Sequence, residues 1–243
     1  MTDHLAVVED VTVGDGLEMY LVRPEPGVEG SAGILYLHWF DESPNANRTQ
    51  FLEEAKTMAQ MGVVSLLPQL VFPWSSPPRD MEADLRRIED EVSSLREAIS
   101  VLGPAGVDER RVALVGHDFG AMHGMALFGE IELAGAVLIA PTPRWSDWFL
   151  TFWPIESDRY EYMRALGEVD PITNVARADC SLLFQFGARD FYIAPMTGLE
   201  LALAAPEPKQ VLSYDSDHAM DLHEIQRDRL AFLEDVLGLA ATS

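Results

Sequence analysis

Hydrophobic positions along the chain fall into two alternating patterns. Short runs rich in apolar and β-prone residues are typical of strands buried in a sheet, and they occupy residues 33–39, 63–67, 112–115, 133–140, 181–187 and 209–214. Longer stretches predict helices, with apolar residues three or four positions apart where the pattern is clearest, and they cover residues 44–61, 80–102, 121–128, 195–205 and 219–237. This alternation of strand and helix predicts a parallel sheet with helices on both faces.

Two further strands are predicted at the beginning of the chain. Gly14-Asp15-Gly16 is a turn signal between the β-prone residues 5–13 and 17–23, so these segments should form a hairpin. With the hairpin, the predicted sheet has eight strands and is mostly parallel. A length of 243 residues suits one α/β domain spanning residues 1–243.

Residues 141–178 interrupt the alternation of strands and helices. Tryptophan, phenylalanine, tyrosine and proline are concentrated there, between two predicted strands. An insertion of this kind predicts a small cap over a pocket, although most of its aromatic side chains must pack the cap onto its own domain. The proline-rich loop 68–78, which contains Trp74, either borders the same pocket or is a rigid surface loop.

Composition narrows the classes of partner. The chain has 40 acidic and 17 basic residues, and its formal charge of −23 repels phosphate backbones and anionic lipids. We therefore expect no nucleic-acid or membrane partner. The apolar runs are too short for a membrane helix and the first residues do not resemble a signal peptide, which predicts a cytoplasmic protein. The single cysteine, Cys180, is expected to be a buried thiol and not a nucleophile.

The most informative motif is Gly116-His117-Asp118-Phe119-Gly120, which follows one predicted strand and opens a helix. A strand, a G-x-X-x-G turn and a helix together are the pattern of a nucleophile elbow. A carboxylate at its centre can attack an sp³ carbon and form an alkyl-aspartyl ester. The alternative is an ordinary strand-to-helix connection in which Asp118 caps the helix.

Two other ionisable residues follow predicted strands. Asp190 comes after 181–187 and His218 after 209–214, so both should meet Asp118 at the edge where parallel strands end. The order nucleophile, acid, histidine resembles the α/β-hydrolase fold, and the compact chain with a modest cap is similar to its dienelactone-hydrolase-like branch.

The elbow departs from that branch. An aspartate at its centre is similar to the elbows of epoxide hydrolases and of haloalkane or haloacid dehalogenases of this fold. The resemblance implies that Asp118 attacks carbon, that His218 activates the water that hydrolyses the ester, and that Asp190 orients His218.

Donors for an oxyanion are expected from backbone N–H groups. Phe119 follows the nucleophile and supplies one, and either Trp39 or Phe40, after the strand 33–39, supplies the other. A metal site around His218 and His223 is not expected, since the nearby Asp217 and Asp221 suit the beginning of a helix. No cofactor is expected.

The leaving group is predicted from the residues available to hold it. Dehalogenases of this fold commonly have a tryptophan after the nucleophile, whereas this chain has Phe119, whose phenyl ring donates no hydrogen bond. Epoxide hydrolases use cap tyrosines as proton donors, and Tyr160 and Tyr162 are the candidates here. An epoxide is therefore the preferred substrate. The other residues expected to contact substrate are Trp74, Trp145, Trp148 and Arg48.

Three alternatives stay open. The first is a dehalogenase that uses the same covalent mechanism, and the second is a dienelactone-hydrolase-like esterase in which Asp118 acts as general base. The third is a non-catalytic binding module. The predicted partners are a small-molecule substrate and water, and the oligomeric state, including a homo-oligomer, is left open.

Overall fold

The computed structural model describes residues 6–28, 30–40, 47–70, 81–152 and 158–239. One sheet has the strand order β1-β2-β4-β3-β5-β6-β7-β8. Its strands are β1 (Val7–Val13), β2 (Leu17–Arg23), β3 (Ala32–Leu37), β4 (Val63–Pro68), β5 (Val112–His117), β6 (Gly135–Ile139), β7 (Ser181–Gly187) and β8 (Lys209–Tyr214). The hairpin β1–β2 joins β4 antiparallel, and strands β3 to β8 run parallel to one another. The predicted eight-stranded, mostly parallel sheet is confirmed.

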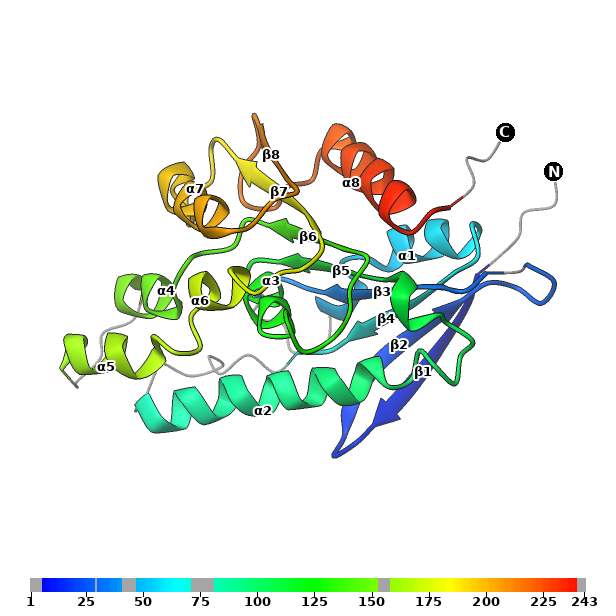
Figure 1. The fold of residues 1–243 in the computed structure, drawn as a ribbon, viewed down its shortest axis with the longest axis horizontal. Coiled ribbons are helices and arrows are strands. Elements are labelled where there is room, and N and C mark those ends of the chain that lie inside the picture. The colour runs from blue at the N-terminus through cyan, green and yellow to red at the C-terminus, as the bar shows by residue number, and fades with distance from the viewer. Residues whose placement is uncertain (1–5, 29, 41–46, 71–80, 153–157, 240–243) are drawn as a thin grey trace.

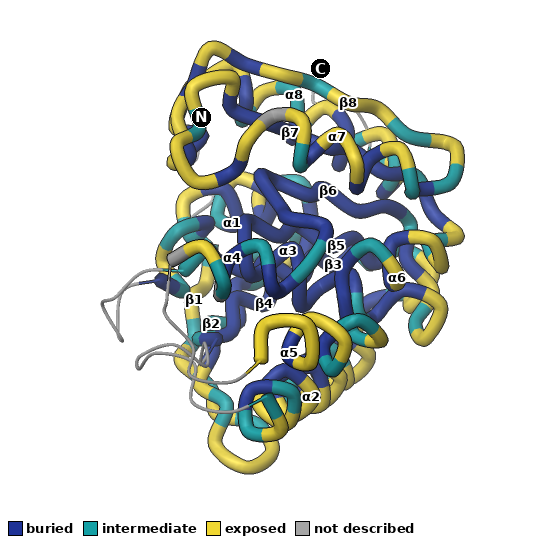
Figure 2. The backbone as a smooth tube through the Cα atoms, turned by 90° about the vertical axis from the view of Figure 1, so that its left-hand side faces the viewer, coloured by how far each residue is buried: buried dark blue, intermediate teal, exposed yellow. Residues whose placement is uncertain are grey.

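Helices flank the sheet on both faces. They are α1 (Leu52–Ala59), α2 (Met81–Ile99), α3 (Phe119–Met125), α4 (Trp145–Phe152), α5 (Arg159–Leu166), α6 (Pro171–Val175), α7 (Pro195–Ala204) and α8 (His223–Val236), with short 3₁₀ turns at Asn47–Thr49 and Glu109–Arg111. Helices α1 and α8 lie on one side of the sheet, and α2 and α3 lie on the other (Figure 1). Strands β3 to β6 are buried throughout, as expected for strands covered on both faces (Figure 2).

Two predicted helices begin later than expected. Residues 44–61 were expected to be helical, but α1 begins at Leu52, and residues 44–46 lie outside the described part. The helix predicted over 219–237 begins at His223, because Met220 adopts a positive φ of 53° and a helix cannot continue through that conformation. Residues 219–222 instead form a loop directly after His218.

The segment 141–178 contains α4, α5 and α6. Helix α5 packs against both α4 and α2, and α6 packs against α3 and α7. Among the helices of the described ranges, none is long and apolar enough to cross a membrane.

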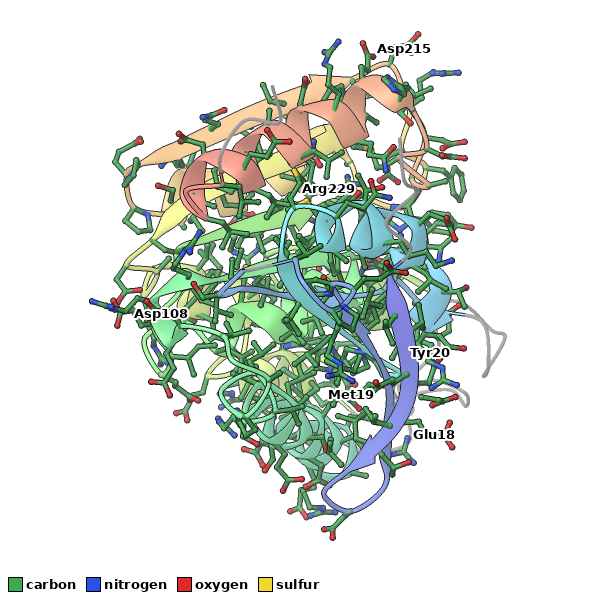
Figure 3. The ribbon with its side chains drawn as sticks, turned by 90° about the vertical axis from the view of Figure 1, so that its right-hand side faces the viewer. Glu18, Met19, Tyr20, Asp108, Asp215 and Arg229 are labelled. Atoms are coloured by element: carbon green, nitrogen blue, oxygen red, sulfur yellow. The ribbon has the colours of Figure 1, made fainter. Side chains whose placement is uncertain are left out.

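A buried ion pair connects the two helices on one face of the sheet. The guanidinium of Arg229 in α8 donates hydrogen bonds of 2.6–3.1 Å to the carboxylate of Glu54 in α1. It also donates to Oε1 of Gln185 in β7 at 3.2 Å. Figure 3 shows Arg229 between α8 and α1. The pair fixes α1 and α8 to the sheet beneath the loop that carries His218.

Candidate active site

Asp118 is held in an unusual backbone conformation between β5 and α3. Its φ is 53° and its ψ is −118°, a region that residues with a side chain rarely occupy. The flanking glycines allow this turn: a Cβ on Gly116 would lie 2.5 Å from Cα of Ala121, and one on Gly120 would lie 2.4 Å from the carbonyl oxygen of Leu37. The Asp118 side chain makes no capping hydrogen bond at the beginning of α3, so it does not act as a helix cap.

The ends of three strands bring Asp118, Asp190 and His218 together. Nδ1 of His218 lies 2.7 Å from Oδ2 of Asp190, and its Nε2 lies 3.6 Å from Oδ2 of Asp118. The other oxygen of Asp190 accepts the backbone N–H groups of Tyr192 and Ile193 at 2.8 and 2.9 Å. The imidazole therefore lies between two carboxylates, and one of these carboxylates is fixed by its own turn.

The two carboxylates determine the charge of the site. Burial alone would lower the pKa of His218, but the hydrogen bonds and charges of Asp118 and Asp190 outweigh it and raise that pKa to about 9. Burial raises the pKa of Asp118, and His218 together with the backbone N–H groups of Phe40 and Phe119 opposes that rise. At neutral pH an imidazolium thus accompanies the buried carboxyl group of Asp118.

Either Trp39 or Phe40 was expected to supply the second oxyanion donor, and the directions of their backbone N–H groups differ. The Trp39 N–H donates to Oε1 of Gln50 at 2.9 Å, so it points away from the elbow. The N–H groups of Phe40 and Phe119 instead act on the carboxyl group of Asp118. Of the two candidates after β3, Phe40 therefore has its N–H directed at the elbow.

Aromatic rings surround His218. Trp39 stacks on its ring at 5.8 Å between centroids, and Trp148 meets it edge-on at 6.1 Å. Tyr192 lies edge-on at 5.1 Å and stacks on Trp148 at 5.6 Å. Tyr192 is absent from the sequence-based predictions. Its position two residues after Asp190 was the available signal, because the turn that holds Asp190 also directs the following side chains.

Trp145 and Trp148 lie near the elbow in different ways. The Trp148 ring is 5.1 Å from that of Phe119, which directly follows Asp118. Trp145 is buried deeper, donates its indole N–H to the carbonyl of Val169 and packs edge-on against His123. Trp148 therefore faces His218, whereas Trp145 packs the predicted cap segment onto α3.

Three other predicted substrate contacts lie elsewhere. The hydroxyl of Tyr162 donates to Asp84 of α2 at 2.9 Å, and Tyr160 is 80% exposed. Arg48 pairs with Asp10 of β1 and lies over the ring of Tyr20. These three side chains do not lie near His218, because Tyr162 and Arg48 bond to residues of other elements and Tyr160 faces solvent.

Trp74, the remaining predicted contact, lies outside the described residues.

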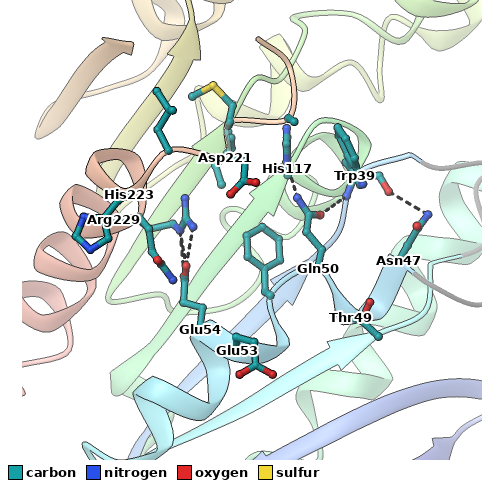
Figure 4. A pocket seen from close by; sticks show the side chains of 16 residues that line it. Trp39, Asn47, Thr49, Gln50, Glu53, Glu54, His117, Asp221, His223 and Arg229 are labelled. Atoms are coloured by element: carbon teal, nitrogen blue, oxygen red, sulfur yellow. Dashed lines mark hydrogen bonds and ion pairs between the residues drawn. The ribbon is translucent and has the colours of Figure 1, made fainter. Parts of the chain in front are cut away.

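A cleft of about 650 Å³ lies between the beginning of α1 and the segment that leads into α8 (Figure 4). Trp39, Gln50, His117, Glu54 and Arg229 are among the residues that line it. The three residues at the strand ends do not line it. Within the described ranges, no group of three or more His, Cys, Asp or Glu side chains is arranged to hold a metal ion.

The family model of the alpha/beta hydrolase family matches residues 35–238. The chain belongs to this family and is a hydrolase. No curated protein matches the sequence significantly.

Solved structures with the same fold include three hydrolases at low sequence identity. An acetyl xylan esterase from Paenibacillus sp. R4 has a TM-score of 0.71 at 18% identity, over 96% of this chain and 89% of the other. A thermophilic esterase from Thermogutta terrifontis has a TM-score of 0.73 at 14% identity, over 98% and 96%. A putative dienelactone hydrolase from Klebsiella pneumoniae has a TM-score of 0.68 at 15% identity, over 96% and 98%.

Proposed function

We propose that the protein hydrolyses small epoxides through an alkyl-aspartyl ester on Asp118. The observation that carries the proposal is the position of the His218 ring between the carboxylates of Asp118 and Asp190. Burial raises the pKa of Asp118, and an imidazolium beside it opposes that rise and so favours the carboxylate, which is the state that attacks carbon. The strained turn presents the carboxylate at the end of β5.

In the first step, an oxygen of Asp118 forms a bond to an epoxide carbon and the ring C–O bond breaks. The resulting alkoxide needs a proton. Tyr192 is the proton donor in this proposal, because its ring contacts both His218 and Trp148. This assignment replaces Tyr160 and Tyr162, whose side chains lie elsewhere.

Esterification changes the charge around His218. The ester of Asp118 is neutral, so one of the two carboxylates that raise the pKa of His218 is lost. The imidazolium then releases its proton, which restores the proton that the alkoxide took from Tyr192. His218 becomes a neutral base only after the nucleophile has reacted.

In the second step, His218 removes a proton from water, and the hydroxide attacks the ester carbonyl of Asp118. The N–H groups of Phe40 and Phe119 stabilise the oxyanion. Collapse breaks the bond to the diol, whose oxygen takes the proton from His218. The carboxylic acid left on Asp118 then passes its proton to His218, which restores the carboxylate and the imidazolium. The net reaction adds one water to one epoxide.

The test is to trap the ester. His218→Ala removes the base needed for the second step, so incubation with styrene oxide should leave an adduct on the peptide that contains Asp118, seen by mass spectrometry. His223→Ala is the matched control, because this exposed histidine at the start of α8 is outside the proposed mechanism. It should turn over and show no adduct. A folded His218→Ala protein that stays unmodified would overturn the covalent mechanism.

Ester hydrolysis is the second candidate function. The paired N–H groups of Phe40 and Phe119 suit the oxyanion of an acyl substrate as well, and the three similar structures named above are two esterases and a putative dienelactone hydrolase. Asp118 would then act as a general base on water. Turnover of para-nitrophenyl acetate without any adduct on Asp118 would favour this function. An adduct formed with bromohexane and not with styrene oxide would identify a dehalogenase.

A further inference from the structure

His117 and Gln50 connect the three loops that form the site. Nε2 of His117 donates to the backbone carbonyl of His218 at 2.9 Å. Nδ1 of His117 lies 2.7 Å from Nε2 of Gln50, and Oε1 of Gln50 accepts the N–H of Trp39 at 2.9 Å. The chain of bonds runs from the loop after β3, through the turn before α1 and the end of β5, to the loop after β8. Figure 4 shows its links between Trp39, Gln50 and His117.

The chemistry of the bonds fixes the state of His117. A carbonyl oxygen can only accept, so Nε2 must carry the proton, and Nδ1 must then accept from the amide of Gln50. Burial lowers the pKa of His117 well below its ordinary value, which keeps the ring neutral as this arrangement requires. The amide oxygen of Gln50 is thereby left to accept the N–H of Trp39. Each nitrogen or oxygen atom in this series of hydrogen bonds is therefore fixed as a donor or as an acceptor by its neighbour.

Two consequences follow for the groups around Asp118. The backbone carbonyl of His218 is anchored, so the loop that carries the imidazole is held in place beside Asp118 and Asp190. The N–H of Trp39 is held by Gln50, and the next N–H, that of Phe40, is the one that acts on the carboxyl group of Asp118. The positions of the proposed base, His218, and of the proposed oxyanion donor, the Phe40 N–H, therefore both depend on the side-chain amide of Gln50.

We infer that Gln50 and His117 are positioning residues that set His218 and the Phe40 N–H for hydrolysis of the ester on Asp118. This inference rests on the proposed function. The oxyanion and the proton transfer to His218 arise in the second step, so a loss of positioning affects that step more than the first. Neither residue touches the reacting atoms.

Gln50→Leu tests the inference because it removes both hydrogen bonds of the amide. With styrene oxide in single-turnover experiments, we expect ester hydrolysis to slow by roughly 10–100-fold and alkylation to change by less than about threefold. The adduct on Asp118 should therefore accumulate in this variant. Gln226→Leu is the matched control, since Gln226 lines the same cleft and lies outside this chain of bonds. It should behave as the wild type.

Separate rates for alkylation and for ester hydrolysis distinguish a positioning role of Gln50 from a purely structural one. A structural role would lower the thermal midpoint and reduce both rates together, and that result overturns the inference. Hydrolysis of the adduct at the wild-type rate overturns it as well. Should Gln50→Leu not fold, Gln50→Asn is used, because its shorter amide can reach one partner at most and should show the same selective loss.

Failure of the inference is distinct from failure of the proposed function. If His218→Ala forms no adduct with styrene oxide, the covalent mechanism itself is wrong. If that adduct forms and the Gln50 variant hydrolyses its ester normally, only the positioning role is wrong.

Discussion

Tyr192 lies edge-on to the ring of His218, with 5.1 Å between the two ring centroids and 62° between their planes. The contact places a phenol beside the proposed base, on a turn that is fixed by the carboxylate of Asp190. Among the tyrosines predicted to serve the site, one is bound to Asp84 and the other faces solvent. The first prediction therefore concerns Tyr192.

Tyr192→Phe should slow alkylation by styrene oxide about 10²-fold, because the alkoxide loses its proton donor while the ring packing is kept. Alkylation by bromohexane needs no proton and should change less than about twofold. Both rates are measured by rapid-quench mass spectrometry of the Asp118 peptide. Tyr160→Phe serves as the control and should leave both rates unchanged. Equal slowing with both reagents would show that Tyr192 shapes the pocket and donates no proton.

Asp190→Asn should lower turnover by about 10²–10⁴-fold, since the amide cannot hold His218 in the required tautomer or stabilise its imidazolium. The remaining oxygen can still accept the N–H groups of Tyr192 and Ile193, so the turn and the thermal midpoint should be retained. Steady-state kinetics and thermal unfolding check the two parts. Turnover that survives the change would indicate another acid, for which Asp147 is the next candidate.

Stability should depend on pH through His218. Its folded-state pKa of about 9 is raised above the ordinary value of 6.5, so the folded protein binds the proton more tightly than the unfolded chain. The resulting stabilisation is fully present below pH about 6.5 and is lost as the pH rises through about 9. Between these values the free energy of unfolding should fall by roughly 2 kcal/mol more in the wild type than in His218→Gln.

Urea unfolding at several pH values measures this difference. Parallel curves for the wild type and His218→Gln would contradict the charged state assigned to the imidazole.

Arg229→Met should destabilise the protein by about 3–5 kcal/mol, because Glu54 is left as a buried charge without its partner. The double change Arg229→Met with Glu54→Met removes both charges and should recover most of that loss. Arg227→Met is the control, since its pair with Asp228 is exposed and should contribute less than about 1 kcal/mol. Urea unfolding reports all three values. A double variant as unstable as the single one would contradict a net cost from the unpaired charge.

Much of the fold was predictable from local sequence, because the hydrophobic pattern marks the strands and a short motif marks the elbow. The strands at 181–187 and 209–214 were predicted with the observed limits, and the elbow was marked by two glycines that steric contacts require. Asp190 and His218 were predictable for a related reason: the parallel sheet brings the ends of its strands to one edge.

The side chains around the site were less predictable, since their directions depend on packing between distant elements. Tyr160 and Tyr162 are two positions apart on α5 and therefore point to different sides of the helix, one into solvent and one toward α2. Arg48 pairs with Asp10, 38 positions earlier, through a hairpin whose placement no local pattern specifies. The link between Gln50 and His117 spans 67 positions for the same reason.

The backbone at Asp118 has a consequence for how this protein can be engineered. A positive φ is unfavourable for aspartate and free of strain for glycine, and a buried carboxyl group must also be desolvated. Asp118→Gly should therefore raise the thermal midpoint while abolishing the proposed chemistry. A library selected only for thermostability would tend to discard this aspartate, so directed evolution of a more robust variant has to screen for turnover at every round.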